Sequence, residues 1–418
     1  MSTALAGDPT IDAGVRQPPR RALLAANAVA LVLAYAIPRA FTLISTVVAA
    51  RVLGRSVFGW YATAGAVAVV ASIVATAGMQ PLLVREVARN HLRAPRLLGA
   101  AHAAKVILVL LMALALLATP LLGFPREILL AAGLLGAGYA VGAFVENLAA
   151  YFQGVERMHV WTQASALQGA ITGGAGAVLV LATHDLLWLC AAPVMGQTAA
   201  LGWLLSSAPS AVRRPPLPAA ADVAALLRQL APFAATFVAT TLFYRADLIL
   251  LSHWRAPAEV GSYSAAYRFL DLIQALAIAG AGALLPHLSR RGRTRTGAAR
   301  RLPWLVLLAA TPLAVALFAL RRPIVEMLYG PAYASTAPIL GILAAAVVPL
   351  ALNMFALAAF AAADAMREAA VLYAAAAALS MTLDLVWIPS HGAIGAAWVA
   401  LLCESGLAIA FMIRMRRS

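Results

Sequence analysis

Long apolar runs alternate with short polar segments along the whole chain. A helix needs about 20 apolar residues to cross a hydrocarbon layer about 30 Å thick, because each helical residue adds 1.5 Å. We count twelve such runs, and each predicts one membrane-spanning helix. The predicted spans are residues 23–50, 57–83, 103–123, 127–152, 160–182, 186–206, 230–252, 259–287, 303–320, 335–363, 369–388 and 393–413.

Composition supports this interpretation. Hydrophobic residues make up 63% of the 418 residues and charged residues only 11%, which is too apolar for a soluble domain and predicts an all-α membrane protein. The formal charge of +15 does not predict a nucleic-acid partner, because the arginines separate apolar runs instead of gathering on one polar face. No histidine pair or cysteine spacing is typical of a metal site, so we expect none.

The positions of the basic residues predict the orientation. If the N-terminus is cytoplasmic, 22 of the 31 basic residues fall in inner segments and 6 in outer loops. Arg39, Arg245 and Arg268 lie within predicted spans. Cytoplasmic loops carry the excess of Arg and Lys, so both termini are expected to be cytoplasmic. Abundant alanine and arginine with a single lysine, Lys105, indicate a GC-rich bacterial genome and hence a multi-pass protein of the bacterial plasma membrane.

The sequence also predicts two similar halves. Gly59-Trp60-Tyr61 and Gly261-Ser262-Tyr263 each follow a predicted outer turn, at an offset of 202 residues. Equal topology in both halves predicts a parallel repeat, in which two six-helix lobes surround a central cavity and are related by a pseudo-two-fold axis. The predicted parts are a cytoplasmic tail (1–21), an N-lobe with helices 1–6 (22–208), a proline-bearing cytoplasmic connector (209–227) and a C-lobe with helices 7–12 (228–418).

Eight short motifs carry a resemblance that covers nearly the whole chain. They are RVLG at 51–54, FGWY at 58–61, LVREVAR at 83–89, YFQGVER at 151–157, RAD at 245–247, EVGSY at 259–263, LYGPAY at 328–333 and GAIGAAW at 392–398. In the order and spacing of these motifs, the chain resembles the polysaccharide and oligosaccharide (O-antigen-type) flippases of the multidrug/oligosaccharidyl-lipid/polysaccharide exporter superfamily. The resemblance implies movement of undecaprenyl-diphosphate-linked sugars from the inner to the outer leaflet, through a cavity that helices 1, 2, 7 and 8 line.

Arg39, Arg245 and Arg268 are the candidate ligands of the diphosphate. An ionisable group inside a lipid-spanning helix is costly unless it faces protein or water, so it indicates a functional lining. Arginine stays charged and pairs bidentately with phosphate oxygens. A structural ion pair is the alternative for each, and Arg245 could instead extend towards the outer interface.

Four acids complete the set of candidate cavity or coupling residues, and they are Asp247, Asp271, Asp384 and Glu404. Arg268 and Asp271 lie three residues apart on one helical face, which predicts either a resting salt bridge that phosphate opens or a permanent one. Arg245 and Asp247 are two residues apart and should have different partners. Resemblance to cation-coupled members implies a site for a coupling proton or sodium ion, and no other cofactor is expected.

Three functions remain open at this point. The first is a flippase that works by alternating access of two lobes. The second is a drug or cation antiporter of the same superfamily, for which an acidic, aromatic cavity is expected instead of one with three arginines. The third is a membrane polysaccharide polymerase or glycosyltransferase, but the loops are too short to hold a catalytic domain, so we expect no enzyme. We expect a monomer whose partners are membrane lipids and other polysaccharide-assembly proteins.

Overall fold

The computed structural model describes residues 20–76, 78–289, 295–363 and 365–417. Most of the predicted N-terminal tail therefore lies outside the described residues. Within the described ranges, every regular element is a helix. The chain is thus an all-helical protein, as its apolar pattern predicts.

Each predicted span coincides with helical segments. In the first half these are α1 (Arg20–Thr76), α2 (Met79–Arg89), α3 (Ala94–Leu117), α4 (Arg126–Gly154), α5 (Met158–Thr183), α6 (Leu186–Ser207) and α7 (Ser210–Arg213), with the 3-10 turns η1 (His91–Arg93) and η2 (Thr119–Leu122). In the second half they are α8 (Ala220–Trp254), α9 (Pro257–Ser289), α10 (Arg295–Ala319), α11 (Arg321–Tyr329), η3 (Pro331–Tyr333), α12 (Thr336–Ala362) and α13 (Met366–Arg417). Helix α8 begins inside the predicted connector, because Leu226 and Leu230 pack in an apolar cluster with residues of α2.

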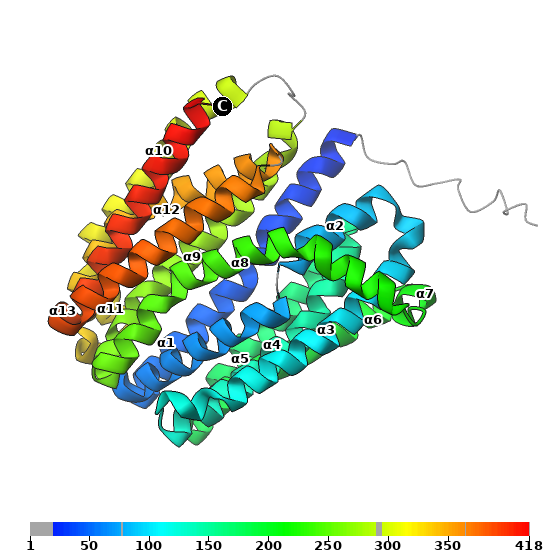
Figure 1. Ribbon diagram of the computed structural model, residues 1–418. Coiled ribbons are helices and arrows are strands. Elements are labelled where there is room, and N and C mark those ends of the chain that lie inside the picture. The colour runs from blue at the N-terminus through cyan, green and yellow to red at the C-terminus, as the bar shows by residue number, and fades with distance from the viewer. Residues whose placement is uncertain (1–19, 77, 290–294, 364, 418) are drawn as a thin grey trace, which may run out of the picture.

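Two of these helices reverse direction at a glycine. α1 has 57 residues and α13 has 52, and each is interrupted by non-helical backbone, at Gly54 (φ 78°) and Gly392 (φ 58°). Glycine adopts positive φ without the steric cost that a Cβ brings. Figure 1 shows that α1 and α13 fold back at the same end of the molecule, where α11 also lies. Each is long enough to hold two crossings of a layer about 30 Å thick.

Eight helices among the described residues are long and apolar enough to span a membrane, or nine if the bent pair Pro303–Ala319 and Arg321–Tyr329 forms one span. Helix α9 is not one of the eight, and it carries Arg268 and Asp271 within its described part. The protein is therefore a multi-pass membrane protein. The total of twelve spans, which counts α1 and α13 twice, stays a prediction.

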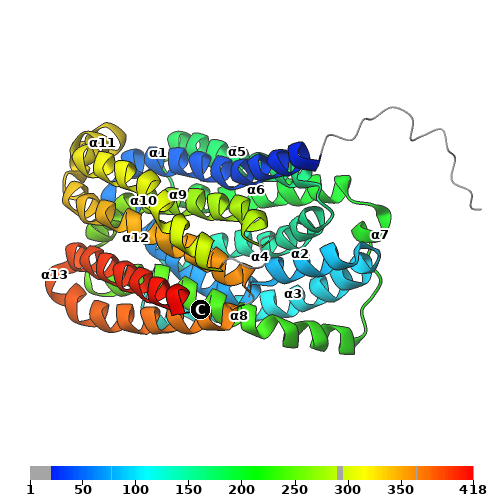
Figure 2. The ribbon, with the colours of Figure 1, turned by 90° about the horizontal axis from the view of Figure 1, so that it is seen from above.

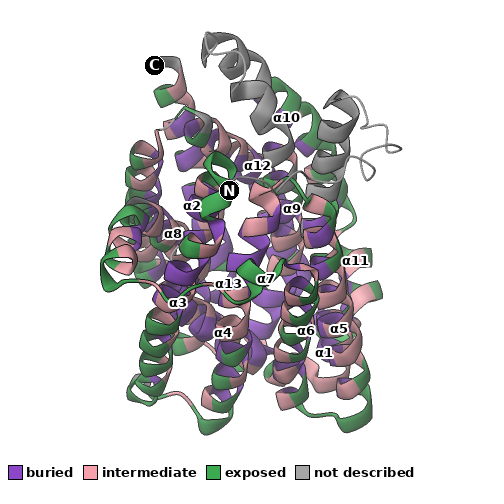
Figure 3. Cartoon of the chain, turned by 90° about the vertical axis from the view of Figure 1, so that its right-hand side faces the viewer, coloured by how far each residue is buried: buried purple, intermediate pink, exposed green. Residues whose placement is uncertain are grey.

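The helices of each half gather on opposite sides of the molecule. Figures 1 and 2 show α3, α4, α5 and α6 on one side and α10, α12 and α13 on the other. The most extensive contact between any two elements joins α1 to α9, so it connects the halves. Buried residues lie where helices face one another, and exposed residues mark the outer faces (Figure 3). The residue boundaries of the two lobes stay a prediction.

A buried cation stabilises the break between α1 and α2. The side chain of Lys105 on α3 is 0% exposed, although the sequence placed it in a basic inner segment. Its Nζ donates to the carbonyl oxygens of Ala75 at 2.8 Å and Thr76 at 3.3 Å, and lies 3.1 Å from Glu146 Oε2. These carbonyls lie at the C-terminal end of α1, where helical carbonyls generally need partners from outside the helix, and the ammonium group supplies one.

We expect Lys105→Met to lower the free energy of unfolding by about 3 kcal/mol, because it leaves the carboxylate of Glu146 and two carbonyls without their donor. The measurement is the midpoint of thermal unfolding of the purified protein in detergent. Adding Glu146→Gln to Lys105→Met should recover part of the loss. Arg93→Ala, at an exposed position nearby, is the control, and an equal effect of both single substitutions would contradict the role of Lys105.

Candidate substrate cavity

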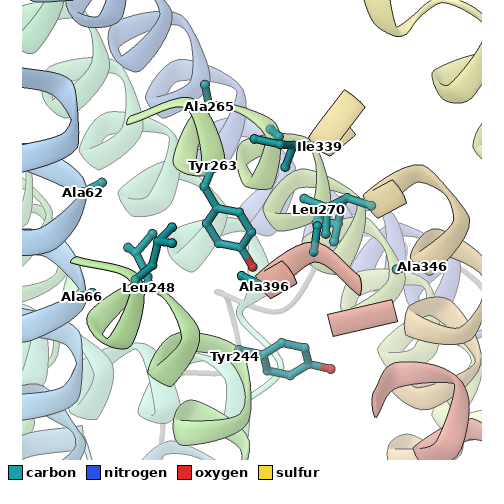
Figure 4. Close-up of a cluster of buried hydrophobic side chains, with 14 of the residues drawn as sticks. Ala62, Ala66, Tyr244, Leu248, Tyr263, Ala265, Leu270, Ile339, Ala346 and Ala396 are labelled. Atoms are coloured by element: carbon teal, nitrogen blue, oxygen red, sulfur yellow. The ribbon is translucent and has the colours of Figure 1, made fainter. Parts of the chain in front are cut away.

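A cavity of about 120 Å³ lies between the two halves of the chain. Its walls come from the second arm of α1, from α4, from α8 and from α9. Figure 4 shows the neighbourhood, where Ala62 and Ala66 of α1 face Leu248 of α8 and Tyr263 of α9. The lining residues are Tyr61, Ala62, Gly65, Ala66, Val69, Leu135, Tyr139, Tyr244, Arg245, Asp247, Leu248, Tyr263, Ser264, Tyr267, Arg268 and Asp271.

Two arginines share one carboxylate in this cavity. Arg245 Nη2 on α8 lies 2.8 Å from Asp271 Oδ1 on α9, and Arg268 Nη1 lies 3.5 Å from Asp271 Oδ2. The predicted pairing of Arg268 with Asp271 is therefore present, but Arg245 makes the shorter contact. Arg245 turns towards α9 instead of extending to the outer interface, because a partly buried guanidinium gains more from a nearby carboxylate than from a distant interface.

Tyrosine rings hold both guanidinium groups in place. The Cζ atom of Arg268 lies 5.8 Å from the ring centroid of Tyr61, and that of Arg245 lies 5.7 Å from the centroid of Tyr267. These are cation–π distances. The Nε of Arg268 is buried and donates no hydrogen bond to any described residue, so this arginine keeps donor capacity for a ligand.

Asp247 has a separate environment on the same wall. The hydroxyl of Tyr263 donates a short hydrogen bond to Asp247 Oδ2, and the backbone N–H of Leu248 lies 2.7 Å from Asp247 Oδ1. Arg245 and Asp247 thus have different partners, as their spacing predicts. The cavity lining contains two arginines and two aspartates and has no formal net charge.

The two remaining candidate acids are not among the residues that line the cavity, and they lie on the two arms of α13. Asp384 is fully buried; Ser380 Oγ lies 3.4 Å from its Oδ2, and its Oδ1 has no hydrogen-bond partner among the described residues. Glu404 is 3% exposed, and Asn353 Nδ2 donates to its Oε2 at 2.5 Å. In the part of the chain that the structure describes, no group of three or more His, Cys, Asp or Glu side chains could hold a metal ion.

Arg39 differs from the other two candidate arginines. Its side chain is exposed on the first arm of α1, and it is not among the lining residues. The structure therefore brings together Arg245, Arg268, Asp247 and Asp271, but not Arg39. A role of Arg39 in substrate binding stays a prediction.

Tyrosine is the residue type that the sequence did not reveal as part of the site. Five of the chain's ten tyrosines line this one cavity. Tyr61 and Tyr263 were visible as the ends of the repeated Gly-x-Tyr motif, whereas Tyr139, Tyr244 and Tyr267 had no local signal. Burial of a phenol between spanning helices is common, so only their convergence in space marks them as lining residues.

Asp271→Asn should lower the free energy of unfolding by about 1–3 kcal/mol, because it leaves two guanidinium groups without their shared acceptor. The midpoint of thermal unfolding in detergent is the measurement. Asp222→Asn is the matched control, since Asp222 pairs with the exposed Arg96 at 3.2 Å and such surface pairs contribute about 0–1 kcal/mol. Equal effects of the two substitutions would show that the ion pairs of Asp271 stabilise the protein no more than an exposed surface pair does.

Comparison with protein families finds one match. The model described as "Polysaccharide biosynthesis protein" matches residues 24–291, which is more than half of the chain. This range includes every residue that lines the cavity. None of the curated proteins compared with the chain matches it in sequence.

Solved structures with the same fold are transporters. An inward-facing multidrug resistance MATE family transporter of the MOP superfamily superposes with a TM-score of 0.74 at 13% identity, covering 93% of this chain and 97% of that one. The lipid II flippase MurJ, in an inward closed conformation, gives a TM-score of 0.74 at 14% identity, with 93% and 88% covered. A mutant of the MATE transporter VcmN from Vibrio cholerae gives 0.66 at 13% identity, with 95% and 96% covered. At these identities the likeness establishes the fold, which this chain shares with those transporters and that flippase.

Proposed function

The chain belongs to the polysaccharide biosynthesis protein family, and on that premise we propose that it moves a polyprenyl-diphosphate-linked oligosaccharide from the inner to the outer leaflet. The observation that carries the proposal is the convergence of Arg245 and Arg268, from two helices, on one cavity between the halves of the chain. A diphosphate cannot enter a hydrocarbon layer without compensation of its charge. Two guanidinium groups held at tyrosine faces supply that compensation.

In this proposal Asp271 occupies the arginines when the substrate is absent. Each of its two oxygens accepts a hydrogen bond from one of the two guanidinium groups. The oxygens of a phosphate group could accept hydrogen bonds from both arginines in the same way. The arriving diphosphate displaces the carboxylate and also accepts from the unused Nε of Arg268. Because the arginines exchange one anion for another, they do not have to face an apolar cavity unpaired at any stage.

The halves have to separate during transport. A cavity of about 120 Å³ is smaller than the pockets of roughly 300–1,000 Å³ that hold drug-sized ligands, and a sugar diphosphate with its glycan is larger than such ligands. We propose that the headgroup and sugar occupy a wider cleft between the halves while the polyprenyl chain stays in the lipid. Arg39, exposed on α1, would meet the diphosphate in that open state.

A proton or a sodium ion is the proposed coupling ion. Asp247 lines the cavity, and Asp384 and Glu404 are buried in the second half of the chain. A buried carboxylate with an unsatisfied oxygen, as in Asp384, is costly when ionised, and a proton or a cation removes that cost. We propose that loading and release of this ion bias the two arrangements of the halves.

A drug or cation antiporter is the second candidate function. The MATE transporter and the MurJ flippase superpose equally well, and the cavity combines five tyrosines with two aspartates. Aromatic rings with nearby acids bind organic cations. Arg245 and Arg268 argue against this substrate class, since a cation would have to replace them as the partner of Asp271.

We further propose a bacterial plasma-membrane location with both termini in the cytoplasm. The support is the excess of basic residues in segments that then face inwards. A monomer is expected, with membrane lipids and other polysaccharide-assembly proteins as partners. The glycan itself leaves no motif in the chain.

We expect Arg268→Ala to lower export of the surface glycan at equal protein level by about tenfold or more, since hydrogen bonds to charged groups contribute about 1.5–3 kcal/mol each. The measurement is surface glycan, together with the lipid-linked intermediate that should accumulate in the cells. Arg268→Lys should retain part of the activity, because it keeps the charge but loses the bidentate geometry. Arg126→Ala, at an exposed arginine of α4, is the control, and full export by Arg268→Ala would refute the proposed function.

If a cation drives transport, collapse of the gradient of that cation should slow export, and collapse of the other cation's gradient should have no effect. Export is followed after selective collapse of the proton or the sodium gradient. We expect Asp384→Asn to make the remaining export insensitive to the effective treatment, because an amide cannot take up the proton or neutralise the cation. If collapse of neither gradient changes export, the coupling proposal is ruled out and the substrate proposal is unaffected.

A further inference from the structure

A pair of glycines lies where the two halves approach each other closely. A Cβ atom at Gly59 would lie 1.8 Å from the carbonyl oxygen of Pro257, and one at Gly261 would lie 2.2 Å from the carbonyl oxygen of Arg55. The two glycines also face each other, since their Cβ positions would lie 3.1 and 3.2 Å from the other's backbone nitrogen. Only residues without a side chain allow the second arm of α1 and the start of α9 to pack this closely.

This contact has the symmetry of the repeat. Gly261 follows Gly59 by 202 residues, and Pro257 follows Arg55 by the same number. The contact of Gly59 with Pro257 is therefore repeated by the contact of Gly261 with Arg55, with the two halves exchanged. This is the pattern of a contact across a two-fold axis. The local axis that relates the halves passes between Gly59 and Gly261.

The glycine pair lies directly beside the cavity. Tyr61 and Tyr263, two residues further along the same two helices, belong to its lining. The contact thus lies at the end of the cavity that faces the Gly54 turn. Figure 1 shows that α1 and α13 reverse at this end.

Polar contacts between the halves surround the pair. Arg51 donates from Nε to the carbonyl oxygen of Leu328 at 2.7 Å and also bonds Met327, so it caps the C-terminal end of α11. Arg55 Nη1 lies 3.1 Å from Ser335 Oγ. The hydroxyl of Tyr333 donates to the carbonyl oxygen of Ala50 at 3.1 Å.

We propose that the Gly59–Gly261 contact, held by Arg51 and Arg55, is the gate that closes the cavity towards the outer side. The proposal rests on the proposed function, because transport by alternating access requires one end of the cavity to open at a time. Glycines bury little apolar surface and have no rotamers to rearrange, so at this point the helices can part with little rearrangement. Beside the pair, the ring of Phe58 packs against that of Tyr333 of the other half and has to separate from it when the gate opens. The exposed arginine contacts then hold the closed state, and exposed polar contacts are individually weak.

The test is accessibility of the cavity from outside the cell. Ala66→Cys places a thiol in the cavity wall, while the two natural cysteines are buried. Intact cells receive a membrane-impermeant maleimide, and labelling of the chain without Ala66→Cys is subtracted. We expect little labelling of Ala66→Cys alone and several-fold more when Gly59→Ala is added, because the methyl group cannot fit beside Pro257.

Arg51→Ala provides an independent arm, since it removes an exposed contact without overfilling the interface and keeps the test decisive if Gly59→Ala does not accumulate. It should also raise labelling several-fold. Gly133→Ala and Arg126→Ala are the matched controls, as a Cβ at Gly133 meets nothing within 4 Å and Arg126 is exposed on α4. Neither control should change labelling.

The gate is refuted if neither Arg51→Ala nor Gly59→Ala, where that protein accumulates, raises labelling above the level of Ala66→Cys alone. The glycan measurement separates this result from failure of the proposed function. Increased labelling together with undiminished glycan export in Arg268→Ala would support the gate and refute the substrate. Unchanged labelling together with lost export in Arg268→Ala would support the substrate and refute the gate.

Discussion

A charged group in the interior of a membrane protein must find its partner within the protein, and this constraint organises the structure. Arg245 and Arg268 share Asp271, and Lys105 neutralises Glu146 while it caps the end of α1. In hydrocarbon each of these charges alone would be prohibitive. The pairs therefore fix how α8 meets α9 and how α1 meets α3.

The two kinds of charge pair serve different purposes. Lys105 is fully buried, bonds two backbone carbonyls and does not line the cavity, so it belongs to the framework of the first half. Arg245 and Arg268 instead line a cavity and contact tyrosine faces, and Arg268 retains an unused donor. A site that exchanges anions needs this incomplete satisfaction, because a fully bonded arginine has nothing left to offer a phosphate.

Movement of the halves depends on how their contact is built. Large interdigitated side chains would have to repack when the interface opens, whereas backbone contacts at glycine separate cleanly. Close to the cavity the halves meet through Gly59 and Gly261 and through the rings of Phe58 and Tyr333, and the arginines that hold them lie on the exposed rim. The glycine pair thereby gives close contact with few side chains to rearrange.

The sequence by itself determined the all-helical, membrane-spanning character of the chain, a turn after the first predicted span and the spacing of Arg268 and Asp271, because apolar length, turn chemistry and helical periodicity are local properties. It also contained the 202-residue offset of Gly59 and Gly261. Only the tertiary structure decided that Arg245 pairs with Asp271, that Arg39 stays outside the cavity lining and that five tyrosines converge there. Each of these outcomes depends on which helices become neighbours, and residues distant along the chain carry no local signal of their future contact.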